Sequence, residues 1–158
     1  MRALIQRVLS AHTTSKHPPR DRLASIGPGL LILVGVQETD NDRILSKMVD
    51  KIANLRIFSD AKGKMNLSAL QAQAATLWVS QITLFADCKG GNRPSFSAAG
   101  DHRIAERNYK QLIDTARSAY PSLPIHHTPF GSDLEIALIN DGPVTPWLDS
   151  EEMLRVKS

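Results

Sequence analysis

The first residues of the chain alternate between apolar and polar side chains, a pattern of period two that is typical of a half-buried β-strand. We therefore predict a strand over residues 2–9. One of its faces would carry Ala3, Ile5, Arg7 and Leu9. Residues 10–22 break the alternation and contain Pro18-Pro19, which cannot donate to a strand ladder, so we predict an exposed loop there.

Further apolar runs, bounded by turn residues, predict the rest of a sheet. They cover residues 23–26, 30–36, 55–58, 74–85 and 134–139. The run over residues 74–85 is rich in β-branched and aromatic side chains around Trp78, which favours a central strand.

Two segments instead repeat apolar residues with the period of an α-helix. The first begins after Thr39 or Asp40, either of which could cap it. Its apolar stripe is Leu45, Met48, Val49, Ile52 and Leu55. The second spans about residues 100–120 and is followed by Pro121. Strands and helices in this order predict an α+β protein.

The composition is that of an ordinary globular protein. The chain has 158 residues, 42% of them hydrophobic and 22% charged, which fits one domain over residues 1–158. No apolar run approaches the ~20 residues of a membrane helix, and the chain does not start with the apolar block of a signal peptide. We therefore expect a cytoplasmic protein.

The formal net charge is +3, and basic side chains gather near the start of the chain. Residues 1–30 contain a single acidic residue, Asp21, and five basic ones, Arg2, Arg7, Lys16, Arg20 and Arg22. This region suits a phosphate-bearing partner, although a solvated surface of mixed charge gives the same pattern. With one cysteine and neither a CxxC nor an HExxH motif, no internal disulfide and no metal site are expected.

The common catalytic motifs are absent. There is no GxSxG for a serine nucleophile, and the basic, glycine-rich residues 89–93 lack the order of a P-loop. Of the five histidines only His126 and His127 are adjacent, and in a strand they would face opposite ways. A histidine-dependent or P-loop site is therefore not expected.

Two polar segments that follow predicted strands are the remaining candidates. Ser80-Gln81-Ile82-Thr83-Leu84 closes one strand, and Asn140-Asp141-Gly142-Pro143-Val144-Thr145 follows another. Taken alone, the first could be an edge strand with satisfied hydroxyls, and the second a loop of ordinary turn residues.

Together the two segments resemble the paired S-Q-x-T-L and N-x-G-P-V-T motifs of the D-aminoacyl-tRNA deacylases. Further segments extend the resemblance over most of the chain. They are Met1-Arg2-Ala3, Gln6-Arg7-Val8, residues 26–31, Arg93-Pro94-Ser95-Phe96 and Leu148-Asp149-Ser150. There are two departures: residues 12–22 are longer and more polar than the family's turn, and Leu134 stands where the family usually has methionine.

The resemblance implies a single α+β domain with mixed and antiparallel, barrel-like β-sheets and two main helices packed outside. It also implies a homodimer without a cofactor, which hydrolyses the ester between a D-amino acid and the terminal adenosine of a tRNA. Glycine mischarged on alanine tRNA is a further substrate that the resemblance implies. An aminoacyl ester is already activated and has a neighbouring ribose hydroxyl, so positioning and oxyanion stabilisation can supply most of the acceleration.

The resemblance also implies roles for single residues. Gly142 and Pro143 would form a cis peptide that enters the partner subunit's pocket and excludes an L side chain, with Arg7 bracing the loop. Ser80-Gln81 would hold the adenosine, and Thr83 would lie near the ester. The other substrate contacts would be Phe96, Leu134, Asn140, Val144 and Thr145, with Lys89 and Arg93 at the acceptor-stem phosphates.

Two other functions stay open. The related proofreader that removes L-alanine from threonine tRNA carries T-Q in place of S-Q, so Ser80 argues against it. A nucleic-acid-binding module without catalysis would also explain the basic first quarter of the chain. Timing ester loss from D- and L-aminoacyl-tRNA separates the three.

Overall fold

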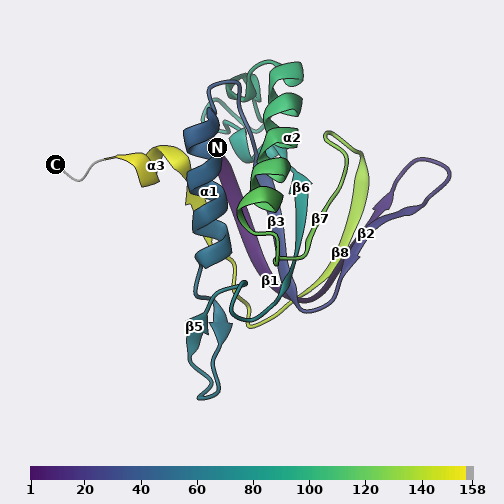
Figure 1. Cartoon of the computed structure of the whole chain (residues 1–158). Coiled ribbons are helices and arrows are strands. Elements are labelled where there is room, and N and C mark those ends of the chain that lie inside the picture. Colours follow the sequence, from purple (N-terminus) through teal and green to yellow (C-terminus); the bar gives the residue numbers. More distant parts are fainter. Residues whose placement is uncertain (156–158) are drawn as a thin grey trace.

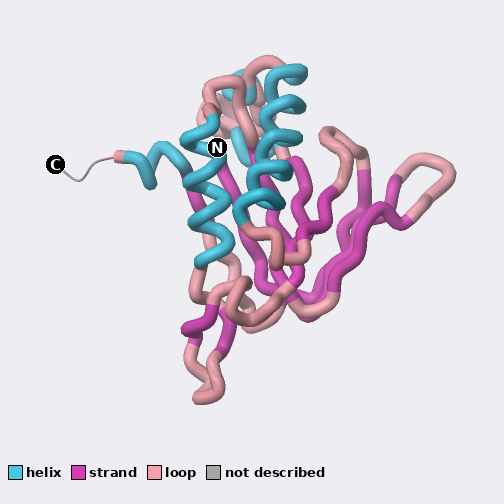
Figure 2. Tube along the Cα trace, viewed as in Figure 1, coloured by secondary structure: helices cyan, strands magenta, loops and turns pink. Residues whose placement is uncertain are grey.

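A computed structural model describes residues 1–155. Seven strands form one strongly curved, barrel-like sheet, and two long helices lie side by side against one face of it (Figure 1). Figure 2 shows two hairpins that project from this body, one between β1 and β2 and the other formed by β4 and β5. The expected α+β class, with two main helices outside a barrel-like sheet, is confirmed.

The strands and helices follow one another closely along the chain. The strands are β1 (Arg2–Ser15), β2 (Arg22–Ile26), β3 (Gly29–Gly35), β4 (Phe58–Ser59), β5 (Met65–Leu67), β6 (Ala75–Ser80), β7 (Ile125–His127), β8 (Leu134–Asn140) and β9 (Trp147–Asp149). The helices are α1 (Asp42–Asn54), α2 (His102–Ala119) and the short α3 (Ser150–Leu154), with 3-10 turns η1 (Ile82–Phe85) and η2 (Ser97–Ala99).

The long strand β1 organises the sheet, because its two halves have different neighbours. Its first half pairs with β3 and β9, and its second half pairs with β2 and β8. The prediction of an exposed loop over residues 10–22 is therefore wrong. Strands on both sides satisfy the backbone of β1 as far as Ser15, Thr13 is fully buried, and only residues 16–21 form the turn.

A β-bulge also changes which side chains of β1 point inward. The pairing with β8 shifts register between Val8 and Ser10, and Leu9 is 51% exposed, whereas the alternation had placed it with the buried Ala3 and Ile5. An extra residue in one strand reverses the inward and outward faces beyond it. Val8 and Ala11 are buried instead.

The other half of the sheet is parallel. β6 pairs in parallel with both β3 and β7. A Cβ added at Gly29 would lie 2.1 Å from the carbonyl oxygen of Ala75, so only glycine allows the two backbones to approach this closely. This contact fixes the start of β3 beside the start of β6, and with it the point at which β6 ends.

The two long helices were predicted correctly, except for the cap of the first one, and the short α3 was not predicted. Asn41, and neither Thr39 nor Asp40, caps α1 by accepting the N–H of Ile44 at 3.1 Å. Asp40 is buried, and its carboxylate lies 2.6 Å from the ammonium of Met1. Asp40 therefore anchors the start of β1 next to the start of α1.

Two further predicted strands have bounds that differ from the structure. The strand predicted over residues 55–58 is β4, which begins only at Phe58, and the strand predicted over 74–85 ends at Ser80. The short strands β5, β7 and β9 were not predicted, because three residues are too few to show a period of two.

Candidate active site

The Ser80 turn, residues 80–85, begins where β6 leaves the sheet. The N–H of Gln81 makes the last ladder bond, to the carbonyl of Val34 at 2.7 Å, and the chain then tightens into η1. A Cβ added at Gly35 would lie 2.7 Å from the Phe85 ring, so glycine leaves room for that ring to pack under the turn. Of the apolar residues at the end of the predicted strand, the 3-10 turn buries Phe85 and leaves Ile82 exposed.

A cavity of about 290 Å³ opens beside this turn, and we call it the Ser80 pocket. It is lined by Val79, Ser80, Gln81, Ile82, His102, residues 130–134 and Ile136. The Ser80 hydroxyl accepts the N–H of Gly131 at 2.9 Å and so holds the loop before β8 against the end of β6. Of the residues predicted to touch substrate, the structure brings Ser80, Gln81 and Leu134 together here.

Two aromatic walls of the Ser80 pocket were missed by the sequence reasoning. The rings of His102 and Phe130 meet edge to face, with centroids 5.0 Å apart. His102 is the first residue of α2, which Asp101 caps, and Phe130 lies in the loop between β7 and β8. No sequence pattern could have paired them, since the contact depends on how α2 packs against the sheet.

The Thr83 hydroxyl is exposed on η1, outside the residues that line the Ser80 pocket. Its Oγ1 accepts a hydrogen bond from the side-chain amide of Gln81. No acidic or basic side chain among residues 1–155 forms a hydrogen bond with it. Thr83 therefore has a donor beside it, and lacks the base that a nucleophilic threonine needs.

Arg2 binds the Ser80 turn through hydrogen bonds, and the sequence had not predicted this role. Its Nη1 donates to the carbonyl of Leu84 at 2.9 Å, and its Nε donates to Asp149 Oδ2 at 3.0 Å. The guanidinium lies 5.0 Å from the centre of the Phe85 ring and 5.9 Å from that of Trp147. Arg2 thus ties the turn to β9.

The Gly142 loop, residues 140–145, is folded around the side chain of Asn140. The Asn140 amide donates to the carbonyls of Arg7 at 2.9 Å and Val144 at 3.2 Å, and its oxygen accepts the Thr145 hydroxyl at 3.2 Å. The Gly142–Pro143 peptide is cis, as the family resemblance implied. Asn140 and Thr145 are therefore placed to hold the shape of the loop.

Arg7 contacts this loop directly. Its Nε lies 3.0 Å from Asp141 Oδ2, but the N–H is not aligned with that oxygen, so the contact is an ion pair. Its Nη1 donates to the carbonyl of Ile57 at 2.5 Å, just before β4. A Cβ added at Gly142 would lie 3.1 Å from Arg7 Nη2 and 2.8 Å from Val144 Cγ2. The guanidinium is thus packed tightly between the loop and the β4–β5 hairpin.

The Ser80 turn and the Gly142 loop lie at different positions along strand β3. Along β3, Leu30 is the partner of Arg7 and Val34 is the partner of Ser80. Four residues of strand separate these positions, roughly 13 Å at ~3.3 Å per residue. None of residues 140–145 is among those that line the Ser80 pocket of the same chain.

The remaining predicted residues lie on the loop after η1. The N–H of Ser95 donates to the backbone carbonyl of Asp87 at 2.9 Å, which closes the loop, and Phe96 follows with its side chain exposed. Lys89 and Arg93 are exposed and form no ion pair within residues 1–155. Their charges are available to a ligand.

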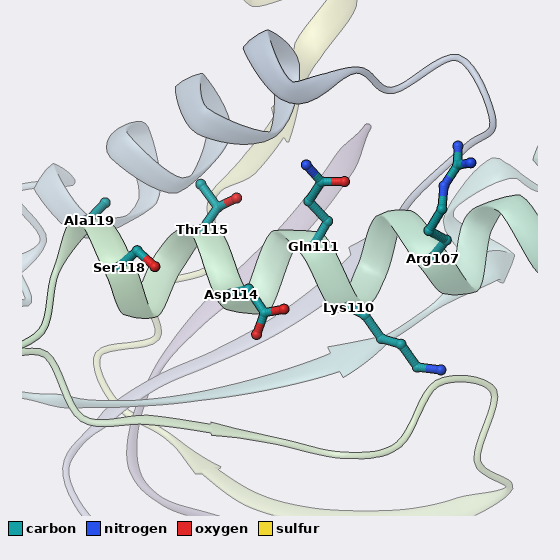
Figure 3. A pocket seen from close by; sticks show the side chains of 7 residues that line it. All are labelled: Arg107, Lys110, Gln111, Asp114, Thr115, Ser118 and Ala119. Atoms are coloured by element: carbon teal, nitrogen blue, oxygen red, sulfur yellow. The ribbon is translucent and has the colours of Figure 1, made fainter.

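A larger but open depression of about 800 Å³ runs along the outer side of α2, and its lining residues are shown in Figure 3. Gln111 and Thr115 point toward α1 there, and Gln111 donates to Asp42 at 2.8 Å. None of the predicted site residues lies in it. We therefore take the smaller Ser80 pocket as the candidate site.

The chain belongs to the D-Tyr-tRNA(Tyr) deacylase family, whose model matches residues 4–149. The family inferred from the two motifs is thereby confirmed.

Curated relatives are similar over almost their whole length. A protein of Methylibium petroleiphilum named D-aminoacyl-tRNA deacylase is 44% identical over 98% of this chain and 99% of its own. A protein of Cereibacter sphaeroides with the same name is 47% identical over 95% of this chain and its full own length.

Solved structures share the fold. One titled "c-Myc DNA Unwinding Element Binding Protein" is 35% identical, with a TM-score of 0.87 over 94% of this chain and 98% of its own. A second solved structure is titled as a probable eukaryotic D-amino acid tRNA deacylase. It is 16% identical, with a TM-score of 0.77 over 93% of this chain and 97% of its own, and it shows the fold alone. Within residues 1–155, no helix is both long and apolar enough to cross a membrane.

Proposed function

We propose that the chain hydrolyses the ester of D-aminoacyl-tRNA, with the terminal adenosine bound in the Ser80 pocket. The observation that carries this is the pocket itself, in which two aromatic rings stand beside the polar side chains of Ser80 and Gln81. Rings offer stacking surfaces to a nucleobase, and hydroxyl and amide groups can bond its edges. Leu134 takes the place of the family's methionine as an apolar wall.

The chemistry needs no nucleophilic side chain. A water oxygen bonds to the ester carbonyl carbon, the bond to the ribose 3′ oxygen breaks, and a proton passes to that oxygen. Backbone N–H groups of the Ser80 turn stabilise the negative charge on the carbonyl oxygen, and the neighbouring ribose hydroxyl assists the transfer. Thr83 positions the ester through its contact with Gln81.

A homodimer supplies the selection against L-amino acids. The Gly142 loop is too far from its own Ser80 pocket, so the loop of a second copy fills the space that an L side chain would take. Val144 supports Gly142 in this position. Two apolar side chains that flank the loop are exposed, Leu9 with an exposed fraction of 51% and Ile139 with one of 57%. Exposed apolar side chains at this position suit a protein interface.

The loop after η1 contacts the rest of the tRNA. Lys89 and Arg93 bind phosphates of the acceptor stem, and the exposed ring of Phe96 covers the aminoacyl end. The reaction belongs in the cytoplasm, where aminoacyl-tRNA is used.

The test times ester loss from D-aminoacyl-tRNA and from the matching L-aminoacyl-tRNA with purified protein. We expect fast loss of the D ester and at least a hundredfold slower loss of the L ester. Preference for L-alanyl-tRNA would identify the related proofreader instead. Binding of tRNA without turnover would identify a nucleic-acid-binding module.

A further inference from the structure

The β4–β5 hairpin presents two lysines on a rigid turn, and we call residues 58–67 the lysine hairpin. The Asp60 carboxylate accepts the N–H groups of Lys62 at 2.9 Å and Lys64 at 3.0 Å, and it also accepts the Asn66 amide at 3.3 Å. Gly63 supplies the left-handed φ of +74° that the turn requires. The tip is therefore ordered before any ligand arrives.

The charges of this hairpin point away from the protein. The N–H groups of Lys64 and Lys62 hold the pKa of Asp60 below its usual range, because its oxygens are bonded to the backbone of the turn. The side chains of Lys62 and Lys64 are exposed and form no ion pair within the described part of the chain. Two free ammonium groups on a fixed turn suit the phosphates of a nucleic acid.

One side chain joins the lysine hairpin to the Gly142 loop. Arg7 donates to the carbonyl of Ile57 at 2.5 Å, next to β4, and pairs with Asp141 at 3.0 Å. In Figure 1 the hairpin projects from the end of the molecule where the chain turns from β8 to β9. Arg7 therefore connects the Gly142 loop to the residue that precedes the hairpin.

From this link we propose that the lysine hairpin binds tRNA phosphates in trans, on the substrate held in the partner subunit's Ser80 pocket. The inference rests on the proposed function and on the proposed homodimer. Arg7 contacts both the Gly142 loop and the residue just before the lysine hairpin of its own subunit. When that loop enters the partner's pocket, Lys62 and Lys64 of the same subunit therefore lie at the rim of that pocket. The acceptor stem is then held by Lys89 and Arg93 of one subunit and by the lysine hairpin of the other.

The first experiment compares the double variant Lys62→Gln/Lys64→Gln with the control Lys47→Gln/Lys51→Gln, which removes the same charge from the exposed face of α1. With full-length D-aminoacyl-tRNA we expect KM to rise about tenfold in the hairpin variant alone. The slope of log kcat/KM against log salt should become shallower by about 1.4 to 1.8, since each phosphate contact contributes ~0.7 to 0.9.

The same variants are also assayed on a D-aminoacyl-adenosine, which lacks the stem. Both should hydrolyse it within twofold of wild type, which shows that the pocket and the dimer are intact. Equal KM values for the two double variants on full-length tRNA, with an active wild type, would overturn the hairpin inference and leave the proposed function standing. An inactive wild type would overturn the function itself.

Mixed dimers with two affinity tags test whether the hairpin acts in trans. Leu134→Arg fills the Ser80 pocket of one subunit, so that each dimer has a single working pocket. A hairpin variant placed on the pocket-blocked subunit should raise KM for tRNA tenfold, and the same variant on the working subunit should leave it at the wild-type value. The opposite pattern would overturn binding in trans.

Discussion

At the scale of single residues, the environment of Thr83 decides what kind of catalysis the site supports. Its hydroxyl oxygen accepts a hydrogen bond from the Gln81 amide, and an amide N–H cannot take a proton away. A nucleophilic threonine needs a base within hydrogen-bond reach. The hydroxyl is therefore suited to positioning.

We predict that Thr83→Ala lowers kcat/KM at most about tenfold, or ~1.4 kcal/mol of transition-state stabilisation. Single-turnover hydrolysis of D-aminoacyl-tRNA measures this, beside a substrate whose terminal adenosine lacks the 2′-hydroxyl. The deoxy substrate should be the slower of the two with wild-type protein. Two results together would instead identify Thr83 as the nucleophile: the Thr83→Ala protein is folded but inactive, and the wild-type protein turns over the deoxy substrate at the normal rate.

Asp40 and Asn41 are neighbours with different roles, and this gives a second prediction. Asp40→Ala leaves the buried Met1 ammonium without its charged partner, which should lower the free energy of unfolding by ~3–5 kcal/mol. Asn41→Ala removes only the cap of α1 and should cost ~1 kcal/mol. Urea unfolding measures both, and equal losses would contradict the assigned roles.

At the scale of elements, the Gly142 loop depends on a conformation that other residues rarely adopt. Gly142 has a φ of +121°, and an added Cβ would press on Val144 and Arg7. We predict that Gly142→Ala displaces the Arg7 guanidinium and lowers kcat/KM for D-aminoacyl-tRNA at least a hundredfold, while far-ultraviolet circular dichroism is unchanged.

Gly27 offers a matched control for this variant. It lacks a positive φ, and a Cβ added there would meet nothing within 4 Å, so Gly27→Ala should keep wild-type kcat/KM. Similar losses in the two variants would mean that the effect of Gly142→Ala comes from general destabilisation.

The sequence predicted those elements whose pattern repeats over several turns or residues. The helical stripe from Leu45 and the apolar alternation from Leu134 both appear in the structure where expected, although the last stripe residue, Leu55, is the C-cap of α1. The extension of β1 was missed because polar residues such as Thr13 are buried there by strands on both sides. The walls formed by His102 and Phe130 depend on tertiary packing alone, which no local pattern reports.

The site motifs were predictable for a different reason. Ser80 and Gln81 close a strand with an obvious apolar pattern, and the resemblance of their motif to a known family gave them a role. In the structure they line a cavity. Arg2 was counted only as one of several basic residues. Its role comes from contacts with Leu84 and Asp149, which are far away in the sequence.

At the scale of the whole molecule, the proposed dimer should depend on the apolar side chains beside the Gly142 loop. Ile139 is 57% exposed, and a charge placed there would have to be buried on association. We predict that Ile139→Glu yields monomers in sedimentation velocity and loses at least a hundredfold in kcat/KM.

A matched charge on another surface controls for solubility effects. Ala119→Glu lies at the exposed end of α2 and should leave both the sedimentation coefficient and the activity at wild-type values. Full activity of a monomeric Ile139→Glu protein would exclude a contribution of the partner to the site.

The pairing of β1 with β8 and β9 has a consequence for how the protein is made. β1 ends at Ser15, but β8, which pairs with one edge of its second half, starts only at Leu134. At a synthesis rate of ~5–20 residues per second, the ribosome needs roughly 6–24 s to reach that strand. During this time the nascent chain carries an unpaired strand edge, which can pair with a second nascent chain made from the same messenger RNA. A pause of the ribosome lengthens the time for which this edge is unpaired.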